Sequence, residues 1–276
     1  MRIDAHQHYW RIERGDYGWI TPDIPVLYRD FMPDDLRSML EKHDIEGSIA
    51  VQAAPTMDET EFLLTLAADE ASILGVVGWL DLLDPDHRKH YERFGQHQKF
   101  LGFRIMIQEM PDSSRILEEA FITALQGYAK EDVPVDILVL PSQLEHSAQM
   151  LHQVPDLRGV IDHIAKPRVR DMEMNNWLQA MREIASFPNI YCKISGLVTE
   201  GDHLNWKPQD FIPYIHHVFQ LFGPDRVMFG SDWPVCLRAA SYDEVIQLLQ
   251  EAMPPEWGKS EQNKLFGLNA KEFYKL

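Results

Sequence analysis

The chain has 276 residues, of which 45% are hydrophobic and 25% are charged, a composition typical of a soluble globular protein. This much apolar material is enough for one large core and excludes intrinsic disorder as the main state. The 26 lysine and arginine residues face 43 aspartate and glutamate residues, so the formal net charge is −17. Such an acidic protein is not predicted to bind nucleic acid, because that binding depends on positive side chains that release counterions from phosphate.

No uncharged apolar run approaches the roughly 18 residues that a membrane span needs, so membrane insertion is excluded. The first ten residues, MRIDAHQHYW, lack the cationic and apolar regions of a signal peptide. Cys192 and Cys236 are too few for a disulfide framework. The chain is therefore predicted to be cytoplasmic, with reduced and buried thiols.

Short apolar runs bounded by turn residues predict eight strands, and amphipathic stretches between them predict helices. In chain order the predicted strands are residues 2–8, 47–53, 75–81, 101–107, 134–140, 157–163, 189–195 and 226–232. The predicted helices are residues 34–43, 59–72, 114–130, 143–152, 173–186, 208–222 and 242–253.

This alternation predicts a single α/β domain over residues 1–276, folded as a (β/α)8 TIM barrel of parallel strands. An open doubly wound sheet, the alternative, typically has about six strands and would leave two unplaced. Residues 9–33 hold aromatic residues and prolines without any helical or alternating period, which predicts a long loop after the first strand. In a barrel this loop lies at the C-terminal face, where such loops cover the active site.

Three histidines and one aspartate stand at the ends of predicted strands. His6 and His8 lie two residues apart on the first strand, so both point to the same side, with Asp4 one layer deeper. Asp232 ends the eighth strand, which neighbours the first in a closed barrel, and His163 ends the sixth. These groups can hold a divalent metal ion or polarise a carbonyl group, and Asp232 can act as a general base. The alternatives are structural histidines with satisfied hydrogen bonds and a helix N-cap at Asp232.

Several polar residues at the same end of the predicted barrel are candidates for binding a substrate. Arg104 and Lys193 each stand within an apolar strand, where a buried cation needs an ion-pair partner or a ligand. The ion-pair alternative for Arg104 is Asp4 or Asp136, while Asp162 is expected to point away from His163. The candidate substrate-binding residues are Gln52, Arg104, Lys166, Lys193 and Trp233.

The sequence has no G-x-S-x-G elbow, no P-loop and no G-x-G-x-x-G after a strand, so the expected nucleophile is water. In the segments DAHQHYW, VIDHIAKP, KISGL and FGSDWPV, the chain resembles the amidohydrolase superfamily, specifically the amidohydrolase-2 family of TIM-barrel metal-dependent hydrolases. Within it the chain is most similar to sugar lactonases such as L-fuconolactonase and L-rhamnonolactonase. The resemblance implies lactone hydrolysis, with Asp232 activating water and His6, His8 and His163 around the carbonyl oxygen.

The resemblance also implies that the three histidines and Asp232 are ligands of one divalent metal ion, with zinc preferred. Some lactonases of this branch retain these ligands and work without metal, so metal dependence stays open. No lysine stands on the fourth strand, where members with two metals carry a carboxylated lysine, and a two-metal site is not expected. Without metal, a protonated histidine or the cations Lys166 and Arg104 have to stabilise the oxyanion.

Two alternatives to a lactonase remain at this point. One is a zinc-dependent nonoxidative decarboxylase like aminocarboxymuconate semialdehyde decarboxylase, whose branch shares the H-x-H pair, the third histidine and the aspartate. The other is a binding protein on a barrel scaffold with an inactive site. The predicted partner is a small-molecule substrate, with further copies of the chain in a homo-oligomer as an alternative to a monomer.

Overall fold

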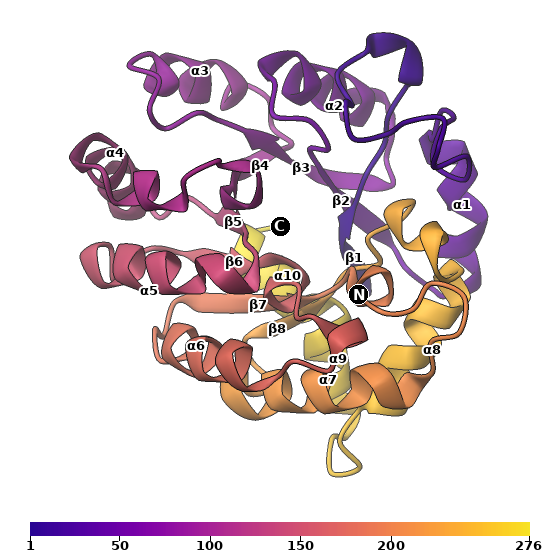
Figure 1. The fold of residues 1–276 in the computed structure, drawn as a ribbon. Coiled ribbons are helices and arrows are strands. Elements are labelled where there is room, and N and C mark those ends of the chain that lie inside the picture. Colours follow the sequence, from indigo (N-terminus) through magenta and orange to yellow (C-terminus); the bar gives the residue numbers. More distant parts are fainter.

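The computed structural model describes all 276 residues, and its centre is one sheet of eight parallel strands in sequence order (Figure 1). The strands are β1 (Ile3–Gln7), β2 (Gly47–Val51), β3 (Ile73–Trp79), β4 (Phe100–Met106), β5 (Val135–Leu138), β6 (Gly159–Ile161), β7 (Ile190–Ile194) and β8 (Val227–Phe229). Parallel strands are buried on both faces, so they read as short apolar runs in the sequence.

The sheet is nearly closed by contacts between the ends of β1 and β8. Gln7 forms a parallel bridge with Trp233. The backbone amide of His8 donates to the carbonyl oxygen of Trp233 at 2.7 Å, and the backbone amide of Asp232 donates to the carbonyl oxygen of His6 at 2.8 Å. The predicted α/β barrel is therefore confirmed. This closure brings residues that lie more than 220 positions apart in sequence to the same end of the barrel.

The helices surround the barrel, and one of them, between β3 and β4, was not among the predicted helices (Figure 1). That helix has the sequence HRKHYERF, in which only Phe94 is fully buried, so its apolar periodicity is weak. The surrounding helices are α1 (Pro33–Lys42), α2 (Met57–Asp69), α3 (His87–Phe94), α4 (Glu119–Lys130), α5 (Leu144–Gln153), α6 (Asn175–Ala185), α7 (Pro208–Phe222) and α8 (Tyr242–Ala252). Short 3-10 helices span Ile12–Arg14, Ile107–Glu109, Ser113–Leu117, Pro141–Gln143, Asp162–Ala165, Val169–Asp171, Leu197–Glu200 and Val235–Arg238.

The C-terminal segment closes the N-terminal end of the barrel. It comprises α9 (Lys259–Asn263), one π-helical turn (Lys264–Leu268) and α10 (Asn269–Tyr274). Phe273 and Tyr274 pack against the first residues of the strands, such as Ile3, and the hydroxyl of Tyr274 donates to Asp136 Oδ1 at 2.6 Å. The barrel interior therefore opens at the C-terminal ends of the strands.

No helix of this structure combines the length and the apolar character that crossing a bilayer requires. Cys192 and Cys236 are both buried and unpaired, as predicted from the sequence.

The long predicted loop between β1 and α1 is present and is fixed to the N-terminal turn of α2. The hydroxyl of Tyr17 donates to Glu59 Oε2 at 2.5 Å, and the amide of Ala53 donates to Glu59 Oε1 at 3.0 Å. The indole of Trp19 donates to the carbonyl oxygen of Ala53 at 2.9 Å. Glu59, which is fully buried, therefore holds the loop over the mouth of the barrel.

Burial raises the pKa of Glu59 to about 7, so the folded chain holds this proton more tightly than the unfolded chain does. The stability from this proton is fully present below pH 4.5, the ordinary pKa of a glutamate, and is lost as the pH rises through 7. We expect Glu59→Gln to remove this loss, which is on the order of 3 kcal/mol. Urea unfolding at pH 5 and pH 8 measures it. The control is Glu61→Gln, on the exposed face of α2, which should lose as much stability between the two pH values as the wild type does. The same loss of stability in all three proteins would contradict the prediction.

Candidate active site

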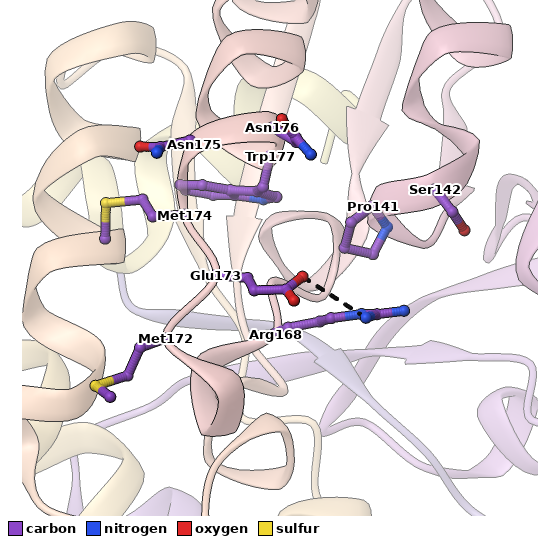
Figure 2. Close-up of a pocket in the computed structure, with 9 residues that line it drawn as sticks. All are labelled: Pro141, Ser142, Arg168, Met172, Glu173, Met174, Asn175, Asn176 and Trp177. Atoms are coloured by element: carbon purple, nitrogen blue, oxygen red, sulfur yellow. Dashed lines mark ion pairs between the residues drawn. The ribbon is translucent and has the colours of Figure 1, made fainter.

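A cavity of about 620 Å³ at the C-terminal face lies between the 3-10 turn before α5 and the first turn of α6 (Figure 2). Its lining includes Pro141, Trp177 and the ion pair of Arg168 with Glu173, at 3.6 Å, but no histidine or cysteine. It shares no lining residue with the smaller cavity at the barrel mouth. Volume alone therefore does not identify the active site here.

The smaller cavity, of about 210 Å³, reaches the histidine and aspartate side chains of the barrel mouth. Its walls come from the last residues of β4 and β5, from the segments that follow β2, β4, β6, β7 and β8, and from the loop after β1. It is lined by His8, Trp19, Ala53, Arg104, Met106, Gln108, Glu109, Leu138, His163, Lys166, Thr199, Glu200, Asp232, Val235 and Arg238. A cavity of this size and polarity suits a small molecule rather than a polymer.

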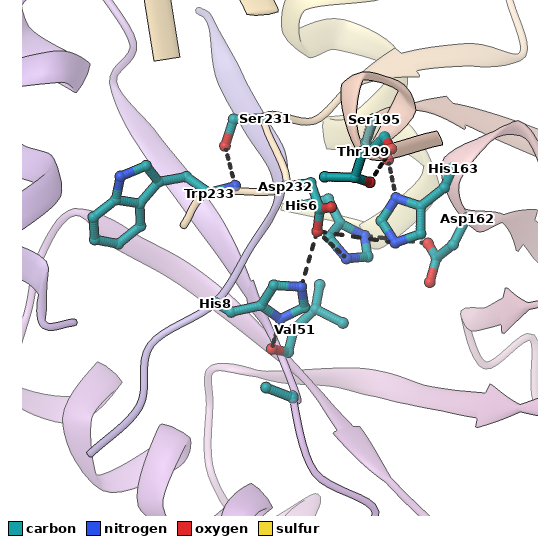
Figure 3. Close-up of polar contacts among 12 residues, drawn as sticks. His6, His8, Val51, Asp162, His163, Ser195, Thr199, Ser231, Asp232 and Trp233 are labelled. Carbon is teal, nitrogen blue, oxygen red and sulfur yellow. Dashed lines mark hydrogen bonds and ion pairs between the residues drawn. The ribbon is translucent and has the colours of Figure 1, made fainter. Parts of the chain in front are cut away.

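His6, His8, His163 and Asp232 lie together at this cavity, and all four are buried (Figure 3). All of them except His6 line it. The Nε2 atoms of His8, His6 and His163 lie 3.2, 3.9 and 4.0 Å from Asp232 Oδ1. One carboxylate oxygen therefore faces three imidazole nitrogens.

His163 and Asp232 do not lie on strands as predicted, because β6 ends at Ile161 and β8 at Phe229. Both residues have left-handed backbones, with φ of 52° and 56°, which few residues other than glycine adopt. This turn also overturns the expectation that Asp162 points away. Its Oδ1 atom lies 3.2 Å from His6 Nδ1, because the alternation of a strand no longer holds beyond Ile161.

Only glycine fits at position 196, in the KISGL segment. Its φ is +63°, and a Cβ atom at this position would lie 2.5 Å from His163 Nδ1 and 3.0 Å from Asp232 Oδ2. Any other residue would clash with the imidazole and strain the backbone. The glycine thus allows the segment after β7 to pack directly against the side chains of His163 and Asp232.

Hydrogen bonds to the Nδ1 atoms orient two of the imidazoles. His8 Nδ1 donates to the carbonyl oxygen of Val51 at 2.7 Å, and His163 Nδ1 bonds the hydroxyl of Ser195 at 2.9 Å (Figure 3). A carbonyl oxygen only accepts, so the proton of a neutral His8 is on Nδ1 and its Nε2 presents a lone pair. That lone pair faces Asp232 Oδ1, and two such acceptors side by side favour a cation between them.

The donor set fits a divalent metal ion. His6, His8 and Asp232 form one group of candidate ligand atoms within 4.8 Å of one another, and His6, Asp162 and His163 form a second. His6 Nε2 is buried and has no hydrogen-bond partner. Three imidazole nitrogens with one carboxylate oxygen are a ligand set that zinc accepts.

The charges in the cluster are set by burial and by neighbouring groups. Burial lowers the pKa of His6 and of His163 well below the usual range, so both imidazoles are neutral near pH 7. Burial alone would raise the pKa of Asp232, but His163, His8 and Lys166 hold it below its ordinary value. The site thus presents a carboxylate anion surrounded by imidazoles.

Two of the predicted substrate-binding residues, Arg104 and Lys166, line the cavity. The guanidinium of Arg104 hydrogen-bonds both oxygens of Gln52 and lies 3.4 Å from Asp162 Oδ2. Its ion-pair partner is therefore Asp162, and the expectation of Asp4 or Asp136 was wrong.

The other three predicted substrate-binding residues do not line the cavity. Gln52 is fully buried beneath Arg104. Lys193 is also fully buried and donates to Asp136, because it lies deeper along the barrel axis than its position near the end of β7 suggested. The indole of Trp233 points away from the histidines and packs edge to face against Phe31, with ring centres 5.2 Å apart (Figure 3).

Some lining residues were missed by sequence reasoning, among them Trp19, Glu200 and Arg238. Trp19 belongs to the predicted loop over the site, but nothing in that loop's pattern distinguishes its two tryptophans. Glu200 and Arg238 lie in short 3-10 helices after β7 and β8. Their only sequence signal is their place within six residues of a predicted strand end.

The model of the amidohydrolase family matches residues 3–276. The chain belongs to the amidohydrolase family. The predicted membership of this family, and with it the prediction of a hydrolase, is confirmed.

This amidohydrolase is 38% identical to the L-fucono-1,5-lactonase of Burkholderia multivorans over 297 residues, which cover 100% of this chain and 96% of that protein. It is 34% identical to the L-fucono-1,5-lactonase of Burkholderia ambifaria over 280 residues, which cover 100% of this chain and 96% of that protein.

A solved structure of an amidohydrolase from Burkholderia multivorans with bound zinc superposes on this amidohydrolase with a TM-score of 0.94. The two chains are 38% identical, and the match covers 100% of this chain and 99% of the other. The backbone that positions the cluster is therefore shared with a zinc-containing relative.

Proposed function

We propose that this amidohydrolase opens the ring of a sugar lactone, with L-fucono-1,5-lactone as the first candidate substrate. The observation that carries the proposal is the full-length identity of 38% to an L-fucono-1,5-lactonase, in a chain whose polar cavity ends on a buried carboxylate among three imidazoles. The predictions of a small-molecule substrate and of a cytoplasmic location belong to the same proposal.

In this proposal Asp232 is the general base. Water attacks the lactone carbonyl carbon while Asp232 takes the proton that the water loses. The carbonyl oxygen becomes an oxyanion beside the imidazoles, and the cations Lys166 and Arg104 on the cavity wall stabilise that charge. Collapse of the tetrahedral intermediate breaks the bond to the ring oxygen, and the proton held by Asp232 passes to that leaving oxygen. The products are a hydroxyl group and a carboxylic acid, which ionises and releases the proton that an assay detects.

His6, His8, His163 and Asp232 are the residues that would hold a divalent metal ion, with zinc preferred. A bound ion would polarise the carbonyl oxygen and lower the pKa of water. The metal-free alternative relies on a protonated histidine or on the cations Lys166 and Arg104 for the oxyanion.

An acid-release assay tests the proposal. With a pH indicator and a panel of five- and six-carbon aldonolactones, including the L-fucono and L-rhamnono forms, we expect acid release at least about tenfold above the spontaneous rate. Exhaustive chelation followed by metal addition tests the metal, since complete and metal-reversible loss would support a metal-dependent site. No acid release across the panel, together with carbon dioxide evolved from a muconate-like acid, would favour the decarboxylase instead.

A further inference from the structure

Three charged side chains on consecutive segments form one wall of the cavity. Lys166 follows β6, Glu200 ends the 3-10 helix after β7, and Arg238 ends the one after β8. None of the three side chains makes a hydrogen bond to another protein group. The only ion pair among them joins Lys166 Nζ to Glu200 Oε1 at 3.9 Å, which is too long for a hydrogen bond.

The neighbouring Arg104 differs, because its guanidinium is already bonded to Gln52 and lies beside Asp162. The Lys166 and Glu200 side chains are only 23% and 24% exposed, so solvent reaches them incompletely. The carboxylate of Glu200 accepts no hydrogen bond from the protein, and burial raises its pKa. A ligand that donates hydrogen bonds to Glu200 would therefore bind more tightly than one without donors.

The chemistry of this wall selects for hydroxyl groups. A carboxylate only accepts hydrogen bonds, whereas an ammonium or a guanidinium only donates them. A hydroxyl does both, so it can donate to Glu200 and accept from Lys166 or Arg238. A ligand carboxylate could bond Lys166 or Arg238 but would leave Glu200 without a donor, and a ligand ammonium could bond Glu200 but would leave both cations without an acceptor.

The position of the wall also suits a ring whose carbonyl lies at the catalytic cluster. Lys166 is three residues beyond His163, and the charge of Asp232 is close enough to Glu200 to raise its pKa further. The rest of the lining is mixed, with apolar side chains such as Met106 and Leu138 and polar ones such as Gln108 and Thr199. A ring bound with its carbonyl at the cluster would meet these three charged groups on one side.

We propose that Glu200, together with Lys166 and Arg238, recognises the hydroxyl groups of the lactone ring and determines which polyhydroxylated lactone this enzyme accepts. This inference rests on the proposed lactonase function. It assigns the stereochemical choice of substrate to Glu200 and Arg238, on the segments after β7 and β8, and leaves the ring-opening step to Asp232.

The first test compares two lactones with the same six-membered ring. L-fucono-1,5-lactone carries ring hydroxyls, and δ-valerolactone carries none. We expect Glu200→Leu to lower kcat/KM for the hydroxylated lactone by about a hundredfold, mostly through KM, because a group that binds a substrate hydroxyl discriminates strongly. Its kcat/KM for δ-valerolactone should stay within about threefold of the wild type.

Two further variants complete this test. Glu200→Gln keeps one acceptor oxygen and should recover part of the loss on the hydroxylated lactone. Glu173→Leu removes a negative charge from the same face of the barrel, at the separate cavity of Figure 2, and should behave as the wild type on both lactones. Parallel losses on the two lactones in Glu200→Leu would overturn the proposal, as would no loss on either.

A binding measurement separates this inference from the proposed function. The probe is 1,5-anhydro-L-fucitol, a cyclic ether with the ring hydroxyls but no carbonyl, and its binding is measured by calorimetry. We expect the wild type and Asp232→Asn to bind it, and Glu200→Leu to bind it at least about tenfold more weakly. Such binding without turnover of any lactone would support the recognition wall and reject the lactonase. If the enzyme turned over lactone but the wild type and Glu200→Leu bound the probe equally well, the lactonase would be supported and the recognition wall rejected.

Discussion

Replacing Asp232 by asparagine should reduce kcat/KM for L-fucono-1,5-lactone by about a hundredfold or more, without unfolding the barrel. The amide has nearly the shape of the carboxylate, but it cannot take a proton from water. It also removes the negative charge that faces the three imidazoles at 3.2 to 4.0 Å. The backbone amide of residue 232 still bonds the carbonyl oxygen of His6, so the closure of the barrel is kept.

The measurement is the initial rate of acid release, with circular dichroism to verify the fold. Asp225→Asn is the matched control, because Asp225 lies before the other end of β8 and pairs with Lys264 at the surface. That variant should keep the wild-type rate. If Asp232→Asn turned over lactone at nearly the wild-type rate with an unchanged spectrum, another group would have to be the base.

The barrel could be predicted because its strands are buried on both faces and therefore appear as separate apolar runs. The run 47–53 corresponds to β2, which begins at the same residue and ends at Val51. The runs 157–163 and 226–232 were too long at both ends. At their C-terminal ends the polar residues that look like a continued strand lie in left-handed turns, and nothing in the residue types IDH or GSD shows this.

The sequence also did not indicate how deep each interior side chain lies along the barrel axis. Strand alternation indicates whether a side chain faces the interior, but it does not distinguish the mouth from the middle of the barrel. Lys193 faces the interior, yet its ammonium bonds Asp136, which Tyr274 of α10 also contacts from below. That helix was not predicted, so the lower half of this network could not be placed from the sequence. Glu200 and Arg238 lie in segments without periodicity, where pattern arguments have no basis.

Replacing Lys193 should have the second large effect, a loss of folding stability. Its ammonium donates to Asp136 Oδ2, lies 3.3 Å from Asp162 Oδ1 and 3.2 Å from His6 Nδ1, and is completely buried with both carboxylates. Removing one partner of a buried ion pair leaves an uncompensated charge in a medium of low polarity. We expect Lys193→Met to lower the free energy of unfolding by about 3 to 5 kcal/mol.

The pH dependence and a second substitution test this cause. Burial already raises the pKa of Asp136 to about 6, and loss of the lysine would raise it further, so the folded variant should take up a proton as the pH falls. The stability lost in Lys193→Met should therefore be smaller at pH 5 than at pH 8. Adding Asp136→Asn to the variant removes one unpaired charge and should recover part of the loss at pH 8.

Urea unfolding at the two pH values measures these differences, and Lys89→Met is the control. Lys89 pairs with Asp86 at 2.6 Å on the surface, where the lysine is 76% exposed and solvent screens the pair, so Lys89→Met should unfold at nearly the same urea concentration as the wild type. Wild-type stability of Lys193→Met combined with a raised KM would mean that Lys193 binds substrate, as its place near the end of β7 first suggested. A large loss of stability that shrinks at low pH would instead mean that the lysine neutralises the two carboxylates beneath His6, and thereby holds the floor of the active site together.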